Sequence, residues 1–189
     1  KKGVWQEERP ERQNFVQNLF DFAGEDTINL NSRALRIWRV IAVKNKFSRV
    51  VVKVGSSSLT YDNGKLNLKL LDRLCRVIAD LRNRGVEVVL VSSGAISVGV
   101  SKMGLPKRPS STSLRQAAAA VGQVELMFIY DKFFSEYGQN IAQVLLTGDV
   151  MMDPVRHRNV VNTFNTLFDH GCLPIVNEND TVSTAELDL

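Results

Sequence analysis

The pattern of apolar and polar positions changes near residue 47 of the 189-residue chain. Before it, residues 15–20 and 35–42 carry apolar side chains at helical spacing, and Gly24-Glu25-Asp26 separates the two stretches. After it, short apolar runs alternate with longer helical segments. The pattern therefore divides the chain into an N-terminal extension of unknown role, residues 1–46, and an α/β body, residues 47–189.

The body contains four apolar runs typical of buried strands, with helical periodicity between them. The runs cover residues 50–54, 86–91, 141–146 and 172–176, and the main helical segments cover residues 70–81, 113–137 and 154–170. Strands that are apolar throughout and alternate with helices predict a mainly parallel sheet with helices on both faces. Gly122, inside the longest helical segment, predicts a close approach to a neighbouring element.

The composition is typical of a globular protein, with 44% hydrophobic residues. No apolar run approaches the roughly 18 residues of a membrane helix, and the first eight residues lack the apolar core of a secretory signal. We therefore expect no membrane association and a cytoplasmic location. The net charge of +4 lies mostly in residues 1–46, which hold nine Lys and Arg against six Asp and Glu. The body therefore offers no clustered basic face for nucleic acid.

The cysteines and histidines are dispersed along the chain. Cys75 falls within a helical segment and Cys172 opens an apolar run, so both are expected to be small buried side chains. His157 and His170 have no ligand-like spacing to either cysteine. The sequence therefore predicts no metal site built from such protein ligands.

The segments that follow the strands differ in character from the rest of the body. In open parallel sheets, ligands bind beyond the carboxyl ends of the strands. Three of the four segments at these ends are rich in Gly, Ser, Asn or Asp, the four being residues 55–58, 92–95, 147–149 and 177–180. This asymmetry is the first functional signal, and it predicts a ligand site at that edge of the sheet.

Lys53 stands one position before the end of its strand, between Val52 and Val54. A lysine in an apolar strand is costly unless its ammonium reaches solvent or an anion. Gly55 and three serines, beginning with Ser56, follow it, so a cation and backbone N–H groups could meet a phosphate here. The alternative is an edge-strand lysine that points outward. The spacing of a Walker A loop is absent, and no G-x-G-x-x-G follows a strand.

Two further segments complete the candidate site. Ser93-Gly94-Ala95 joins a strand to a helix, where small residues and free N–H groups favour an anion, or form a plain tight turn. Asn177-Glu178-Asn179-Asp180 places two carboxylates and two amides at a strand end, for a substrate ammonium or as a solvated polar loop. Together with Lys53, these segments predict a zwitterionic substrate beside a phosphate donor.

Five segments occur in an order that resembles the bacterial glutamate 5-kinases of the amino-acid kinase family. The segments are VVKVGS (51–56), VSSGAI (91–96), AVGQ (120–123), QVLLT (143–147) and PIVNEND (174–180). The resemblance runs from residue 48 to residue 187 and leaves residues 1–46 outside. It implies the family's three-layer αβα sandwich with a mainly parallel central sheet, here incomplete.

The resemblance also implies an activity. ATP would phosphorylate the side-chain carboxylate of L-glutamate to γ-glutamyl phosphate, with Mg²⁺, as the first step of proline biosynthesis. Feedback inhibition by proline and a homo-oligomer are implied as well. Because the γ-carboxylate is already an anion at neutral pH, we expect no general base, and Asp180 is assigned to the substrate α-ammonium.

Motif positions imply two groups of site residues. The residues that correspond to ATP-phosphate-binding positions, with the first of them catalytic, are Lys53, Gly55 and Ser56. The residues that correspond to glutamate-binding positions are Ser93, Gly94, Ala95, Asn177 and Asp180. The amides of the two glycines would also face the transferring phosphoryl group.

The sequence departs from the family pattern where it stops, at Leu189. The family continues into a Gly-Asp-Asn-Asp loop, a nucleotide-binding half with a second lysine and, in many members, a small RNA-modification-type domain. We therefore expect these 189 residues to be inactive alone. Two alternatives stay open: another member of the family, such as an acetylglutamate, carbamate or uridylate kinase, or a non-catalytic module that senses proline or glutamate.

Overall fold

A computed structural model of the chain describes residues 27–30, 48–61 and 63–183. The strands are β1 (Thr27–Leu30), β2 (Arg49–Val54), β3 (Glu87–Ser92), β4 (Asn140–Leu146) and β5 (Cys172–Glu178). The helices are α3 (Ser56–Leu59), α4 (Leu68–Asn83), α5 (Ala95–Lys102), α6 (Thr112–Glu136) and α7 (Pro154–Asp169), with a 3-10 turn η2 (Gly148–Met151). The helices expected at 15–20 and 35–42 lie outside the described residues.

The strands form one sheet in the order β1-β2-β3-β5-β4, and every neighbouring pair is parallel. The four strands expected in the body are all present, so the prediction of a mainly parallel sheet is confirmed. Strand β1 was not predicted; it comes from the N-terminal extension and pairs with β2, with Asn29 opposite Lys53. Its segment, TINL, is too short to show the alternation that marks a strand.

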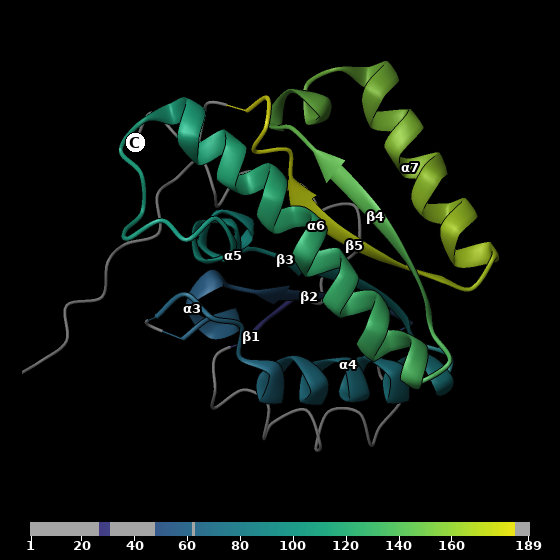
Figure 1. The fold of residues 1–189 in the computed structure, drawn as a ribbon. Helices are drawn as coiled ribbons and strands as arrows, with labels where there is room; N and C mark the ends of the chain where they lie inside the picture. Colours follow the sequence, from purple (N-terminus) through teal and green to yellow (C-terminus); the bar gives the residue numbers. More distant parts are fainter. Residues whose placement is uncertain (1–26, 31–47, 62, 184–189) are drawn as a thin grey trace, which may run out of the picture.

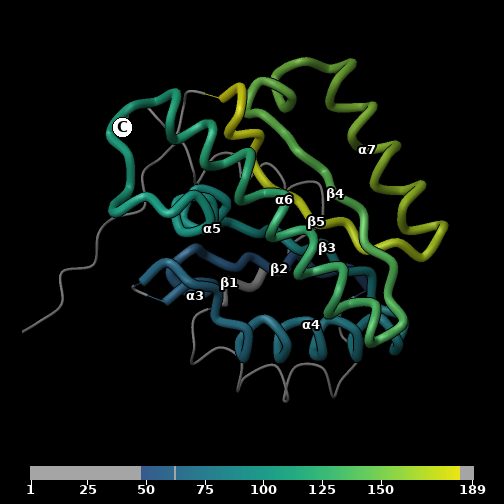
Figure 2. The backbone as a smooth tube through the Cα atoms, viewed as in Figure 1, coloured from purple at the N-terminus to yellow at the C-terminus, as the bar shows by residue number. Residues whose placement is uncertain are grey.

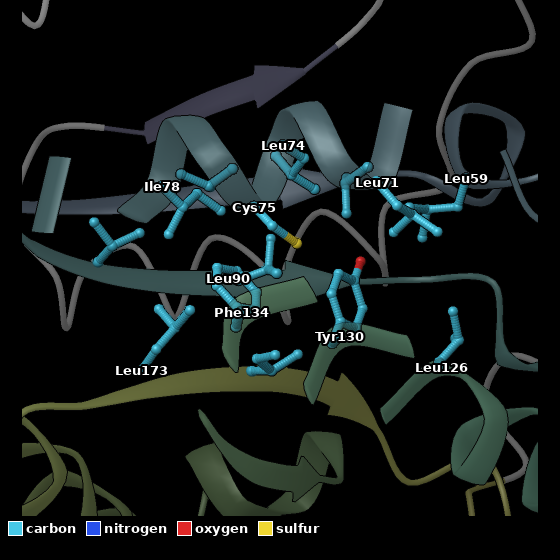
Figure 3. Packing of buried hydrophobic residues seen from close by; sticks show 14 of the residues in the cluster. Leu59, Leu71, Leu74, Cys75, Ile78, Leu90, Leu126, Tyr130, Phe134 and Leu173 are labelled. Atoms are coloured by element: carbon cyan, nitrogen blue, oxygen red, sulfur yellow. The ribbon is translucent and has the colours of Figure 1, made fainter. Parts of the chain in front are cut away.

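Helices cover both faces of the sheet and produce the three αβα layers (Figure 1). Side chains alternate between the faces along each strand. Val52 and Leu90 belong to a core cluster with α4 and α6, whereas Val51 and Val89 belong to a second cluster with Phe164 of α7. Figure 3 shows the first cluster, in which side chains of α4 and α6 meet over one face of the sheet. The predicted fold class is confirmed.

Local signals fix where the helices begin. The Asn67 side chain accepts a hydrogen bond from the Leu70 N–H at 3.1 Å and caps α4. Asp153 caps α7 by accepting from the Val155 N–H at 2.8 Å, and Pro154 occupies the first helical position. In the described part of the chain, no helix combines the length and apolarity needed to cross a bilayer.

The helices α5 and α6 touch through their backbones, and two glycines make this possible. A Cβ added at Gly122 would lie 1.8 Å from the Ala95 carbonyl oxygen, and one at Gly99 would lie 1.7 Å from the Ala118 carbonyl oxygen. The close approach predicted at Gly122 is therefore confirmed. Because Ala95 is the first residue of α5, this contact also sets where α5 begins relative to α6.

Two expectations about burial need correction. Residues 141–146 were expected to form a buried strand, but β4 is the last strand of the order, and Gln143 and Leu145 are exposed while Leu146 is buried. Cys75 is fully buried as expected, and burial raises the pKa of its thiol far above the ordinary value. Cys172 is only half-buried, because it begins β5 opposite exposed Asn140 of the outer strand.

Candidate active site

The carboxyl ends of β2, β3 and β5 lie side by side. Val54 is opposite Ser92 across β2 and β3, and Val91 is opposite Val176 across β3 and β5. The segments that follow these strands therefore begin at one edge of the sheet. Because neighbouring strands are about 4.8 Å apart, the ends of β2 and β5 are separated by about 10 Å. This edge holds every site residue that the sequence predicted.

The first of these segments is the turn from β2 into α3. Gly55 caps α3 with φ −80° and ψ 158°, values that any residue adopts. Its carbonyl oxygen accepts from the Ser58 N–H at 3.0 Å, while the Ser56 N–H is one of the first-turn amides that a helix leaves without an internal partner. A Cβ at Gly55 would meet nothing within 4 Å. Neither the backbone nor the packing therefore requires glycine here, and open space lies beside these amides.

The second segment, Ser93-Gly94-Ala95, packs directly on the first. The Ser93 N–H donates to the Val54 carbonyl oxygen at 3.1 Å. Gly94 adopts φ 102°, which side chains disfavour, and a Cβ there would lie 3.5 Å from the Ser56 Cα. Figure 2 shows α3 and α5, which begin at these turns, next to each other beyond the ends of β2 and β3. The two glycine turns therefore form one continuous backbone surface.

Lys53 lies on the opposite face of the sheet from the α4 and α6 layer. Strand alternation places it with Arg49 and Val51, and the Arg49 guanidinium stacks 4.6 Å above the Phe168 ring of α7. Lys53 is half-buried, opposite Val91 of β3. Because β2 lies between β1 and β3, the alternative of an outward-pointing lysine on an edge strand does not fit this sheet.

The third segment is the end of β5 and the loop that follows it, and hydrogen bonds to β4 and α6 hold it in place. Asn177 and Asp180 are only 9% and 8% exposed, which contradicts the alternative of a fully solvated polar loop. The Asn179 N–H donates to the Leu146 carbonyl oxygen at 2.7 Å and ties the loop to the end of β4. Asn177 donates from Nδ2 to Gln123 Oε1 of α6 at 2.9 Å. The end of β5 therefore presents a buried amide, and the loop after it presents a buried carboxylate.

Two side chains of α6 that were not predicted as site residues, Gln123 and Tyr130, support this edge. Tyr130 is fully buried, and its hydroxyl lies 2.9 Å from Ser92 Oγ at the end of β3. Burial raises the pKa of the Tyr130 phenol, so it stays neutral. The two residues are seven positions apart and share one face of α6. That spacing of polar groups on an otherwise apolar face was the available signal.

Replacing Tyr130 with Phe should lower the free energy of unfolding by about 1 kcal/mol, because the buried Ser92 hydroxyl keeps only its weaker hydrogen bond, at 3.4 Å to the Ser93 carbonyl oxygen. Chemical denaturation of the two proteins measures the difference. The matched control is Tyr61→Phe, since the Tyr61 hydroxyl donates to Asn67 Oδ1 at 3.0 Å but the residue is 51% exposed. The control should change stability by less than about 0.5 kcal/mol. Equal losses in both variants would contradict a structural role for the buried pair.

Metal ligands are not gathered within the residues that the structure describes, where no three His, Cys, Asp or Glu side chains lie close enough to hold an ion. These residues therefore do not fit an all-protein metal cage. Mg²⁺ is commonly held by one or two carboxylates together with substrate phosphates.

The sequence is similar to known proteins of one family. Residues 48–188 match the model of the amino acid kinase family. A glutamate 5-kinase of Listeria innocua is 55% identical over 147 residues, which are 78% of this chain and 53% of that protein. Glutamate 5-kinases of Clostridium perfringens and Enterococcus faecalis are 57% and 55% identical over 74% of the chain and 52% of their own lengths. The chain thus spans about half the length of the curated relatives it matches.

Proposed function

The chain belongs to the amino acid kinase family, and from this we propose that it supplies the acceptor-binding part of an ATP-dependent kinase that phosphorylates the side-chain carboxylate of L-glutamate. The observation that carries the proposal is the contact between the two glycine turns, Gly55-Ser56 and Ser93-Gly94-Ala95. The strand that carries Lys53 ends at the same edge of the sheet. A cation and two sets of backbone amides at one edge suit a transferring phosphoryl group.

The proposed site residues fall into two groups, those that bind ATP and those that bind glutamate. Lys53, Gly55 and Ser56 hold the phosphates of ATP, and Lys53 is the catalytic cation. The glutamate is held by residues of the second turn, of the end of β5 and of the loop after it, namely Ser93, Gly94, Ala95, Asn177 and Asp180. The buried carboxylate of Asp180 and amide of Asn177 suit the α-ammonium of an amino acid.

The chemical step needs positioning more than acid–base groups. A γ-carboxylate oxygen of glutamate attacks the γ-phosphorus of ATP, the bond from that phosphorus to the β–γ bridging oxygen breaks, and ADP leaves with the bond's electrons. The acceptor is already an anion, so no proton has to be removed. The Lys53 ammonium and the turn amides stabilise the negative charge on the γ-phosphoryl oxygens.

Several further properties belong to the same proposal. Mg²⁺ would enter with the ATP phosphates and offset their charge. Proline as a feedback inhibitor and a homo-oligomeric assembly are expected from the family resemblance. Exposed Val124 and Phe128 on α6 are compatible with a subunit contact. The reaction belongs in the cytoplasm, where ATP and free glutamate are present.

The test of the proposed function is turnover by the full-length gene product. ADP release should depend on glutamate, and the acyl phosphate should be trapped by hydroxylamine as a hydroxamate. N-acetylglutamate and carbamate should be poor acceptors. Phosphorylation of either one in preference to glutamate would move the protein to another activity of the family. Calorimetry that detects amino-acid binding but no binding of a non-hydrolysable ATP analogue would support the sensor alternative.

Replacing Gly55 with Ala should weaken ATP binding without lowering the stability of the fold. The backbone angles suit alanine and its Cβ would meet nothing within 4 Å, so the melting temperature should not fall. The new methyl group would occupy space beside the first-turn amides, and the KM for ATP should rise by about tenfold or more, as expected for one lost hydrogen bond to a charged group. Steady-state kinetics with varied ATP measures this change. An unchanged KM for ATP would place the phosphates elsewhere.

A further inference from the structure

Gln123 links the long helix α6 to the end of β5. Its Oε1 accepts a hydrogen bond from Asn177 Nδ2 at 2.9 Å, although 54 positions separate the two residues. Strand alternation places Asn177 with Leu173 and Ile175 on the face of the sheet that α6 covers. The contact therefore joins two fixed elements, and it lies directly beside the loop that carries Asp180.

The backbone of α6 is held firmly at this point. Gly122, the residue before Gln123, is packed against α5 so closely that an added Cβ would lie 1.8 Å from the Ala95 carbonyl oxygen. The Gln123 side chain thus starts from a position that cannot shift toward α5 without a backbone clash. Gln123 itself is half-buried, which limits the water that could replace its amide.

The hydrogen bond determines which end of the Asn177 amide is used on α6. An asparagine amide has a donating end, Nδ2, and an accepting end, Oδ1. With Nδ2 bonded to the Gln123 carbonyl oxygen, Oδ1 is the end left for another partner. Rotating the Asn177 amide alone by half a turn would bring two carbonyl oxygens together, which is unfavourable, so the reverse pairing requires the Gln123 amide to rotate as well.

We propose that Gln123 is a positioning residue that keeps the Asn177 amide oriented with Oδ1 available to the α-ammonium of the amino-acid substrate. This inference rests on the proposed function and specifies how the site selects its acceptor. An ammonium offers three donors and accepts nothing, so it pairs with a carboxylate and an amide oxygen but not with an amide NH₂. Asp180 in the loop after β5 supplies the carboxylate, and Asn177 near the end of β5 supplies the oxygen; both residues are buried.

The test uses two variants of Gln123 in the full-length gene product and two acceptors. Gln123→Met keeps the length of the side chain but removes the acceptor, whereas Gln123→Glu keeps an oxygen that can only accept. Glutarate has the same carbon chain as glutamate without the α-ammonium. The readout is the ratio of kcat/KM for glutamate to kcat/KM for glutarate, which a general loss of packing would not change.

We expect Q123M to lower this ratio by about 10- to 100-fold, the effect of one hydrogen bond to a charged group. The loss should appear in the KM for glutamate, while the KM for ATP stays within about twofold. Q123E should keep the ratio within about threefold of the original, because its carboxylate still accepts from Asn177 Nδ2. If Q123M does not fold, Gln123→Leu provides a second variant without an acceptor.

Gln139→Met is the matched control. Gln139 Oε1 accepts from Arg82 Nη1 at 2.7 Å just before β4 begins, at the opposite end of the sheet. This variant loses an amide acceptor and some stability, and its acceptor ratio should not change.

The outcomes separate the inference from the proposed function. If the full-length gene product without substitutions does not phosphorylate glutamate, the proposed function is refuted. An active protein in which Q123M keeps the ratio, or in which Q123E loses it as fully as Q123M, overturns the role of Gln123.

Discussion

Replacing Lys53 with Met in the full-length gene product should lower kcat for glutamate phosphorylation by about 100- to 1,000-fold, the usual effect of removing one preorganised donor from a developing charge. Methionine keeps an unbranched stem beside Val91 of β3, so the strand should still pack. The loss should therefore appear in kcat, with a melting temperature close to that of the original protein. Steady-state kinetics and thermal unfolding together measure it.

A second lysine provides the control for that experiment. Lys69, in the first turn of α4, is exposed, and Lys69→Met should leave kcat within about twofold. Arginine should not replace Lys53 fully, because a planar guanidinium cannot occupy the place of a compact ammonium. A Lys53→Met protein that retains normal kcat would remove the cation from the proposed mechanism.

Replacing Gly122 with Ala should destabilise the protein by about 3 kcal/mol or more, at the upper end of overpacking effects. The added Cβ would lie 1.8 Å from the Ala95 carbonyl oxygen and 2.5 Å from the Gly99 nitrogen, and these backbone atoms cannot move aside as a side chain would. The helices α5 and α6 must separate, which displaces the turn that begins α5. Equilibrium denaturation measures the loss of stability, and any protein that still folds should bind glutamate poorly.

Two other glycines provide a parallel test and a control for this prediction. Gly99→Ala disrupts the same contact from the side of α5, because its Cβ would lie 1.7 Å from the Ala118 carbonyl oxygen. It should cause a comparable loss of stability. Gly148→Ala is the control, because a Cβ there would meet nothing within 4 Å, and its effect should stay below about 1 kcal/mol. A Gly122→Ala protein as stable as the Gly148→Ala protein would mean that the two helices can readily move apart.

The sequence predicted the parts of the fold that depend on local signals. The β-branched run before Gly55 identified β2, and apolar periodicity identified α4 and α7. The caps at Asn67 and Asp153 are local signals of the same kind, but they were not used in the prediction. The glycine turns at the strand ends were predictable for the same reason, because small residues accumulate where the backbone must reverse or approach a ligand.

What the sequence did not predict depends on contacts between distant segments. Nothing local in TINL shows that β1 would pair with β2, and nothing local in β4 shows that it would lie last in the sheet and stay half-exposed. The bond from Gln123 to Asn177 likewise spans 54 positions. Such pairings follow from strand order and helix packing, which a single sequence specifies only through the whole fold.

The alternation of side chains across the sheet has a further consequence for how this protein could change its chemistry. Lys53 shares its face with the α7 layer, whereas Asn177 and its partner Gln123 share the other face with α6. Under the proposed function, the catalytic cation Lys53 and the pair that orients the substrate-binding amide are thus supported by different layers, which meet at the edge of the sheet. If the proposed function holds, substitutions in the α6 layer should change which carboxylic acid is accepted, while Lys53 is still supported by the layer on the other face.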